Sequence, residues 1–229
     1  LTVLATSDLH GARVPELPAL RDAAGEACVV VDNGDTLGGL SALAFATASA
    51  PRRCDTLAWL QSVGAAAWNL GNHDLDDGVA ALRERVAQGA VPALCGNLTV
   101  DGAPPVSGHV VCETPAGRVG IAGALTPMAR QMWAPGLKAR TGLGDPQVAL
   151  EADCRRLRES CDFVVALAHF GLPLPPVDPR HPEPVVENPG DVVLARLSAR
   201  ETGGRPLADC VVMGHTHVVR CDVVDRTAW

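Results

Sequence analysis

Short apolar runs alternate with amphipathic stretches along this chain, and each pattern predicts a different element. The apolar runs predict buried β-strands over residues 2–6, 28–31, 65–70, 92–95, 162–168 and 210–213. Patterns of helical period predict α-helices over residues 16–24, 40–48, 54–63, 79–86, 147–160 and 191–200. Residues 109–113 and 118–124 flank a Thr-Pro-Ala-Gly turn and predict a β-hairpin, and residues 218–224 are typical of a last strand. The alternation predicts a layered α/β fold, and the hairpin indicates that its sheets are mixed.

Polar side chains gather where five of the predicted strands end, in each case beside a glycine. They are Asp8 and His10, Asp35, Asn72 and His73, His169, and His215 and His217. Ligands collect at the carboxyl ends of strands in open α/β sheets. One histidine after a strand is usually structural, but five of the seven histidines lie in these loops. The sequence therefore predicts that these loops converge into one site.

The residue types in these loops indicate which cation the site would hold. Imidazole, carboxylate and amide oxygen without thiolate suit Zn²⁺, Mn²⁺ or Fe. Seven candidate ligands exceed what one tetrahedral ion takes. Two divalent ions about 3.5–4 Å apart that share one carboxylate would use all of them, which is an arrangement that favours phosphoryl hydrolysis. Asp74, next to these ligands, is interpreted as a cap of the helix that follows.

Composition narrows the function classes further. The chain has 229 residues, enough for one domain, and its core must be built from Ala, Val and Leu because aromatic residues make up only 3%. The net charge of −7 argues against nucleic acid as a partner, and no apolar run approaches the length of a membrane span. The eight cysteines form no CxxC pair and are interpreted as small core residues, with Cys154 and Cys161 as a candidate disulfide.

The ordered motifs carry a resemblance to a known family. Asp8-x-His10, Gly34-Asp35, Gly71-Asn72-His73-Asp74, His169 and Gly214-His215-Thr216-His217 resemble the five motifs of the calcineurin-like metallophosphoesterases. Asp76, Gly96-Asn97 and the Ala168–Gly171 stretch are similar to the branch that contains 5′-nucleotidases and 2′,3′-cyclic-nucleotide phosphodiesterases. The resemblance implies a four-layer α/β/β/α sandwich of two mixed β-sheets.

The resemblance also implies a role for each site residue. Asp8, His10, Asp35 and His217 would hold the first ion, and Asp35, Asn72, His169 and His215 the second, with Asp35 bridging the two. His73 would stabilise the transition state and protonate the leaving oxygen, and Asp76 would orient its ring. Asn97 could approach the phosphate or only stabilise a turn. The implied reaction is hydrolysis of a small phosphate ester, most simply a nucleotide, by in-line attack of hydroxide that the two cations supply.

Alternatives stay open at this point. The same metal core could serve a nuclease or a phosphatase of proteins or other small molecules, and a binding module could keep the site without the chemistry. Proteins of the 5′-nucleotidase and cyclic-nucleotide phosphodiesterase branch usually carry a further C-terminal domain that clamps the base. This sequence stops twelve residues after His217. We therefore expect residues 1–229 to be a catalytic domain that lacks this C-terminal domain, either because the sequence is a fragment truncated at both ends or because the protein has dispensed with the domain. The resemblance favours an exported protein, and a cytoplasmic location stays open.

Overall fold

The computed structural model describes residues 1–37, 54–89, 91–172, 189–199, 204–217, 221–224 and 226–229. Its strands are β1 (Thr2–Thr6), β2 (Cys28–Asp32), β3 (Ala65–Asn69), β4 (Ala93–Leu94), β5 (Leu98–Val100), β6 (His109–Thr114), β7 (Gly117–Leu125), β8 (Thr141–Leu143), β9 (Phe163–His169), β10 (Cys210–Met213), β11 (Val223–Val224) and β12 (Thr227–Ala228). Its helices are α1 (Leu17–Ala24), α3 (Cys54–Ser62), α4 (Gly78–Gln88), α5 (Ala129–Met132), α6 (Pro135–Lys138), α7 (Pro146–Arg158) and α8 (Gly190–Ser198), with a 3₁₀ turn η1 (His73–Leu75).

The strands form two main sheets and one small one. The four-stranded sheet has the order β1-β2-β3-β4, and all of its pairs are parallel. The six-stranded sheet has the order β11-β12-β10-β9-β7-β6 and is mixed, because its outer strands β6 and β11 are antiparallel to their neighbours. Strands β5 and β8 pair separately in antiparallel fashion. The two-sheet α/β prediction is confirmed, with the difference that the four-stranded sheet is parallel throughout its described strands.

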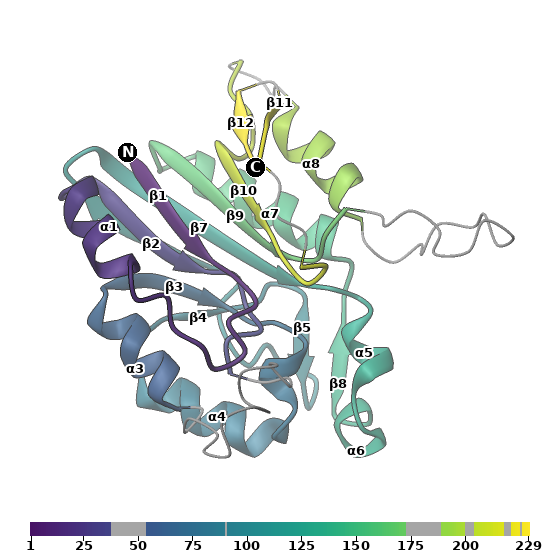
Figure 1. Ribbon diagram of the computed structural model, residues 1–229. Coiled ribbons are helices and arrows are strands. Elements are labelled where there is room, and N and C mark those ends of the chain that lie inside the picture. The colour runs from purple at the N-terminus through teal and green to yellow at the C-terminus, as the bar shows by residue number, and fades with distance from the viewer. Residues whose placement is uncertain (38–53, 90, 173–188, 200–203, 218–220, 225) are drawn as a thin grey trace, which may run out of the picture.

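Alternation along the strands divides the core into layers. On β2, Val29 and Val31 pack against the other sheet, whereas Val30 packs against Leu17 of α1. On β9, Val165 lies in the same inter-sheet layer, and alternate residues of that strand pack against α7 and α8. Helices α3 and α4 cover the outer face of the four-stranded sheet together with α1. This is the α/β/β/α sandwich that the resemblance implied (Figure 1).

Several predicted elements differ from the structure. The predicted helix over residues 40–48 lies outside the described residues. The strand predicted over residues 218–224 is only Val223–Val224 in the described part, and β12 follows it. Strands β5 and β8 and helices α5 and α6 were not predicted, because three or four residues are too few to show a period.

The structure confirms the interpretation of Cys154 and Cys161 as small core residues, and the disulfide alternative for them is not met. Both thiols are free and buried, and both lie in the apolar layer between the six-stranded sheet and its helices. Cys154 belongs to α7 and Cys161 follows that helix, so each fills the core as a small apolar side chain. Within the described residues, no helix combines the length and the apolar character that a membrane span requires.

Candidate metal centre

The loops that follow β1, β2, β3, β9 and β10 meet at one end of the sandwich. Asp8 and His10 follow β1 of one sheet, and His215 and His217 follow β10 of the other. The two sheets are tied together there, because the backbone N–H of His215 donates to the Asp8 carboxylate over 3.0 Å. Figure 1 shows the carboxyl ends of β1 and β10 on the same side of the molecule. The predicted convergence of these loops is therefore what the structure has.

The first group of ligand atoms comprises Asp8, His10 and His217. One ligand atom from each of the three lies within 4.8 Å of the others. His217 Nε2 lies 3.4 Å from His10 Nε2 and 3.4 Å from Asp8 Oδ1. The His217 side chain is 60% exposed, whereas that of Asp8 is 13% exposed. The group is therefore open to solvent on the His217 side.

The second group comprises Asp35, His169 and His215 and is more deeply buried. His169 is fully buried, and its Nε2 lies 3.2 Å from Asp35 Oδ2. The same Nε2 lies 3.2 Å from Asn72 Oδ1, so the predicted amide ligand joins this group. His169 Nδ1 lies 2.7 Å from the backbone oxygen of Asn33. Because a carbonyl oxygen only accepts, Nδ1 carries the proton and a neutral His169 presents the lone pair of Nε2 to the site.

The lone pairs of His169 Nε2, Asp35 Oδ2 and Asn72 Oδ1 therefore lie close together. They would repel one another unless a cation lies among them. Burial would lower the pKa of His169, but the Asp35 carboxylate beside it overcomes this effect and raises that pKa to about 9. Burial would likewise raise the pKa of Asp35, but the His169 charge and hydrogen bond lower it to about 2. Burial, and after it the His169 charge, lowers the pKa of His215 to about 4. In the metal-free protein a proton on His169 Nε2 thus occupies the position, between Asp35 and Asn72, that suits a divalent ion.

The residues of both groups fit divalent metal ions. Nitrogen and oxygen ligands lie about 2.0–2.2 Å from Zn²⁺, which places neighbouring ligand atoms roughly 3–3.5 Å from one another. The contacts of 3.2–3.4 Å in both groups match that spacing. Each group combines imidazole with carboxylate and contains no thiolate, which is the donor set of Zn²⁺, Mn²⁺ or Fe sites. Whether Asp35 bridges the two ions stays a prediction.

The backbone at the site is strained. Among the described residues, seven other than glycine have φ in the left-handed region. Five of the seven are predicted metal ligands: Asp8 (55°), His10 (46°), Asp35 (52°), His215 (68°) and His217 (52°). A non-glycine residue in this conformation costs roughly 1–2 kcal/mol. Such strain persists where the surrounding structure enforces it, which is typical of functional sites.

Glycine is required where the two central loops touch. A Cβ atom on Gly71 would lie 2.1 Å from the Asp35 backbone nitrogen, and one on Gly34 would lie 2.6 Å from the Gly71 nitrogen. Only glycine at both positions lets the Asp35 loop and the Asn72 loop approach this closely. The backbone N–H of His73 then donates to Asp35 Oδ1 over 2.7 Å. This contact fixes the Asp35 carboxylate against the loop that carries Asn72.

The interpretation of Asp74 as a helix cap is wrong. Asp74 is fully buried and accepts hydrogen bonds of 2.8 Å from the backbone nitrogens of Leu37 and Gly71, which joins the same two loops. Helix α4 begins only at Gly78, because the 3₁₀ turn η1 intervenes. Burial, and after it the charge of Asp35, raises the pKa of Asp74 to about 7.

His73 and Asp76 lie beside the metal-binding groups rather than in them. His73 Nδ1 lies 2.9 Å from Asp76 Oδ2, and the His73 ring contacts the His10 ring edge to face with centroids 5.5 Å apart. The His73 and Asp76 side chains are 29% and 37% exposed. With Nδ1 facing a carboxylate, Nε2 is the ring nitrogen of His73 that this pair leaves available.

The side chain of Asn97 forms hydrogen bonds to backbone groups of the fold. Its amide donates to the backbone oxygens of Leu125 and Gly144 over 2.8 and 3.1 Å, and its oxygen accepts from the Leu125 nitrogen over 2.9 Å. It is 5% exposed, so the structure favours the turn-stabilising alternative over a phosphate contact. Two contacts to Asn72, from Met132 and Trp133, were not predicted. No local pattern in the sequence could indicate them, because they join segments that are about sixty residues apart.

Comparisons with known proteins agree with this geometry. The model of the family described as calcineurin-like phosphoesterase matches residues 1–219. No curated protein sequence matches the chain. Solved structures with the same fold include one assigned as a 5′-nucleotidase from Staphylococcus aureus, with 18% identity, a TM-score of 0.78 and 99% of this chain covered. A 5′-nucleotidase precursor from Thermus thermophilus has 21% identity, a TM-score of 0.67 and 95% of this chain covered.

A third structure is the calcineurin-like phosphoesterase YfkN from Bacillus subtilis. It has 18% identity and a TM-score of 0.69, and the match covers 95% of this chain and 72% of that one. By contrast, this chain spans 47% and 42% of the two 5′-nucleotidase structures. At these identities the likeness concerns the fold.

Proposed function

The chain belongs to the calcineurin-like phosphoesterase family, and from this premise we propose that it hydrolyses phosphate esters of nucleotides with two divalent metal ions. One observation carries the proposal: two groups of His and Asp ligand atoms lie side by side at the strand ends, with the His73–Asp76 pair next to them. Members of the family are generally metal-dependent hydrolases of phosphate esters. A site that only bound metal would have no need of the adjacent His73.

The chain's own residues would divide the work as follows. Asp8, His10, Asp35 and His217 would hold one ion, and Asp35, Asn72, His169 and His215 the other. When bound, such ions neutralise phosphoryl oxygens and lower the pKa of water towards ~7, which provides a nucleophile at neutral pH. The hydrogen bond from His73 N–H to Asp35 holds this carboxylate in place before any ion arrives. The Asp35 carboxylate is thus preorganised.

His73 would act on the leaving group. As the bond between phosphorus and the leaving oxygen breaks, negative charge grows on that oxygen, and a proton donor beside it stabilises the transition state. Asp76 keeps His73 Nδ1 occupied over 2.9 Å, so His73 Nε2 is the atom that would donate. A general acid of this kind contributes typically ~10²–10⁴-fold.

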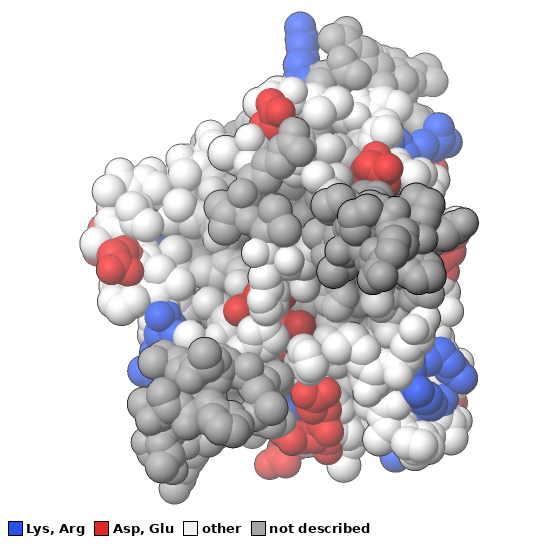
Figure 2. All heavy atoms as spheres, turned by 45° about the vertical axis from the view of Figure 1, so that its right-hand side comes forward, with Lys and Arg blue, Asp and Glu red and all other residues white. Residues whose placement is uncertain are grey.

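Two observations favour a nucleotide or another small phosphate ester as the substrate. Two structures of the same fold are assigned as 5′-nucleotidases, which favours a nucleotide. On the face shown in Figure 2, basic side chains of the described residues lie in separate small groups near the edges, and acidic ones lie between them. A nucleic-acid substrate would need a continuous basic surface, so a small phosphate ester is the better candidate.

The test is a substrate panel on metal-stripped protein. We expect no phosphate release until Mn²⁺, Zn²⁺ or Fe²⁺ is added back, and then hydrolysis of 5′-, 3′- or 2′,3′-cyclic nucleotides in preference to single-stranded DNA. Asp35→Asn is the matched variant for the metal dependence. The amide keeps the Oδ1 acceptor for the His73 N–H, and only the negative charge of this metal-ligand candidate is lost. Metal binding without turnover of any ester in the panel would contradict the proposal. Faster cleavage of DNA than of mononucleotides would favour the nuclease alternative.

A further inference from the structure

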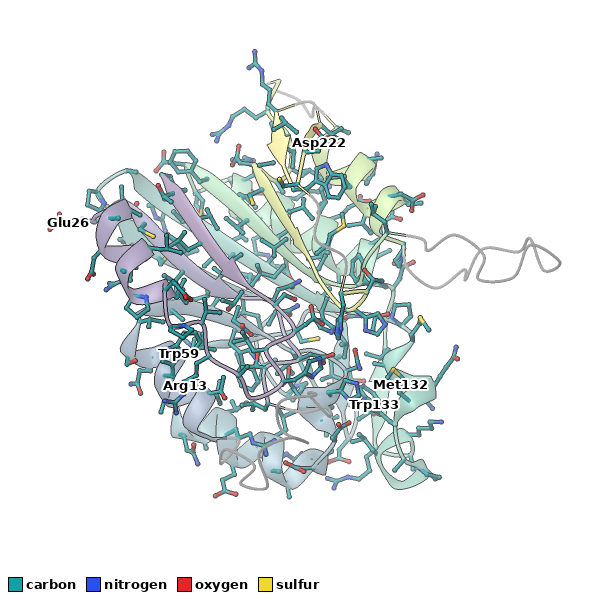
Figure 3. The ribbon with its side chains drawn as sticks, in the orientation of Figure 1. Arg13, Glu26, Trp59, Met132, Trp133 and Asp222 are labelled. Carbon is teal, nitrogen blue, oxygen red and sulfur yellow. The ribbon has the colours of Figure 1, made fainter. Side chains whose placement is uncertain are left out.

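Met132 and Trp133, at the end of α5, contact two different parts of Asn72: its side-chain amide and its backbone oxygen. The indole Nε1 of Trp133 donates to the backbone oxygen of Asn72 over 2.8 Å. The side-chain Nδ2 of Asn72 lies 3.6 Å from Met132 Sδ, within hydrogen-bonding range for sulfur. Figure 3 shows Met132 and Trp133 next to each other at this end of the molecule. Neither residue belongs to the candidate metal ligands.

The orientation of the Asn72 amide decides whether it can bind a cation. Only the oxygen of an amide binds a hard or borderline metal ion, because its nitrogen has no available lone pair. A thioether sulfur accepts weakly and never donates, so Met132 favours the orientation in which Nδ2 faces it. In that orientation Oδ1 lies 3.2 Å from His169 Nε2, on the side of the second group. A flipped amide would present the nitrogen to that group.

Trp133 is itself firmly placed. Its side chain is 4% exposed and lies in the apolar cluster that also contains Leu75, Leu125 and Ala129. Asn72 is 1% exposed, so water cannot replace the indole N–H as a partner for the Asn72 carbonyl without a local rearrangement. The hydrogen bond therefore connects the position of Asn72 to the packed core around α5.

We propose that Trp133 and Met132 are positioning residues for the second metal ion: Trp133 fixes the Asn72 backbone, and Met132 sets the side-chain amide with its oxygen towards His169. The inference rests on the proposed function, since it needs Asn72 as a ligand. Groups that orient metal ligands typically change metal affinity by ~10–100-fold when they are removed. Neither side chain needs to touch the substrate for this role.

The chain offers a matched control for Trp133. Trp68 is 1% exposed and lies in the same apolar cluster, but its Nε1 has no hydrogen-bond partner in the described part of the chain. Trp133→Phe and Trp68→Phe therefore remove the same atoms from the same core, and only the first removes a hydrogen bond. A merely structural role would change both variants alike. Met132→Leu is a third variant, which keeps the volume and removes the sulfur.

The experiment is calorimetric titration of the metal-stripped chain with Mn²⁺, together with the thermal midpoint of each variant. We expect Trp133→Phe to weaken one of two binding events about tenfold, with the other unchanged, and Met132→Leu to weaken the same event by a smaller factor. Trp68→Phe should bind Mn²⁺ like the wild type, and its thermal midpoint should be comparable to that of Trp133→Phe.

Equal Mn²⁺ affinities in Trp133→Phe and Trp68→Phe would overturn the inference. If Trp133→Phe does not fold, Met132→Leu decides: weakened binding of one ion supports the inference, and unchanged binding of both overturns it. Failure of the proposed function would be distinct, because the wild type itself would then not bind two ions or would hydrolyse no ester.

Discussion

The proposed role of His73 as a general acid gives a functional prediction that can be tested directly. His73→Ala removes the imidazole but keeps the backbone N–H that donates to Asp35 over 2.7 Å. The loop and the metal ligands should therefore stay in place, and only the proton donor is lost. Asp76→Asn is the companion change, because it removes the charge that faces His73 Nδ1 over 2.9 Å and leaves an isosteric side chain.

The structure sets different magnitudes for the two variants. Loss of a general acid costs ~10²–10⁴-fold in kcat when the leaving group is a poorly stabilised alkoxide. The His73–Asp76 pair is 29% and 37% exposed, and exposed pairs are worth about 0.2–1 kcal/mol, a factor of at most about 5. A buried Asp that fixes a catalytic His can be worth about 10⁴, but water can replace much of what Asp76 supplies here. We therefore expect Asp76→Asn to lower kcat by only about two- to fivefold.

The assay compares two leaving groups on the same enzyme. A nucleoside 5′-monophosphate releases an alkoxide that needs a proton, whereas p-nitrophenyl phosphate releases an anion that is stable at neutral pH. We expect His73→Ala to lose roughly 10²-fold or more on the nucleotide and much less on the nitrophenyl ester. Metal content and thermal midpoint serve as controls. Equal losses on both substrates, or an intact rate on the nucleotide, would refute a proton-donating His73.

Three further predictions concern strain, protons and thiols. In metal-free protein, His217→Gly should be more stable than His217→Ala by about 1 kcal/mol, measured by urea unfolding, since φ is 52° there; a less stable Gly variant would contradict the strain. Calorimetry in buffers of different ionisation enthalpy should show that filling the His169 group at pH 7 releases close to one proton, because the adjacent carboxylate raises the pKa of His169 to about 9 in the metal-free protein. Metal affinity at this group should then rise with pH up to about 9, and no proton release would be inconsistent with the charged imidazole. Among the described cysteines, exposed Cys221 should react with a thiol reagent in the native state, whereas Cys95 and Cys154, whose pKa burial raises to about 12, should not; mass spectrometry of the labelled protein would decide.

The metal-ligand candidates could be predicted from the sequence because each one lies at the end of a strand of apolar residues or within four residues after it. Asp35 comes three residues after β2, and His169 is the last residue of β9. The carboxyl ends of such strands meet at the same edge, so a local pattern was enough to predict the convergence. The layered fold followed from the same alternation of strands and helices.

Other features depend on contacts that no local pattern encodes. Asp74 precedes a helical segment and so resembles a cap, yet its partners are the Leu37 and Gly71 nitrogens, one of them in another loop. Trp133 contacts Asn72 from the end of a four-residue helix, which is too short to show a period. The left-handed backbone at Asp8 and His10 likewise arises from contacts between loops.

The central claim is that residues from both sheets hold two metal ions in one pocket. Anomalous X-ray scattering from a crystal of the Mn²⁺-loaded protein tests it most directly. The account predicts two Mn²⁺ peaks about 3.5–4 Å apart, one beside Asp8, His10 and His217 and the other beside His169 and His215. A single peak, or two peaks that do not both lie among these ligand groups, would contradict it.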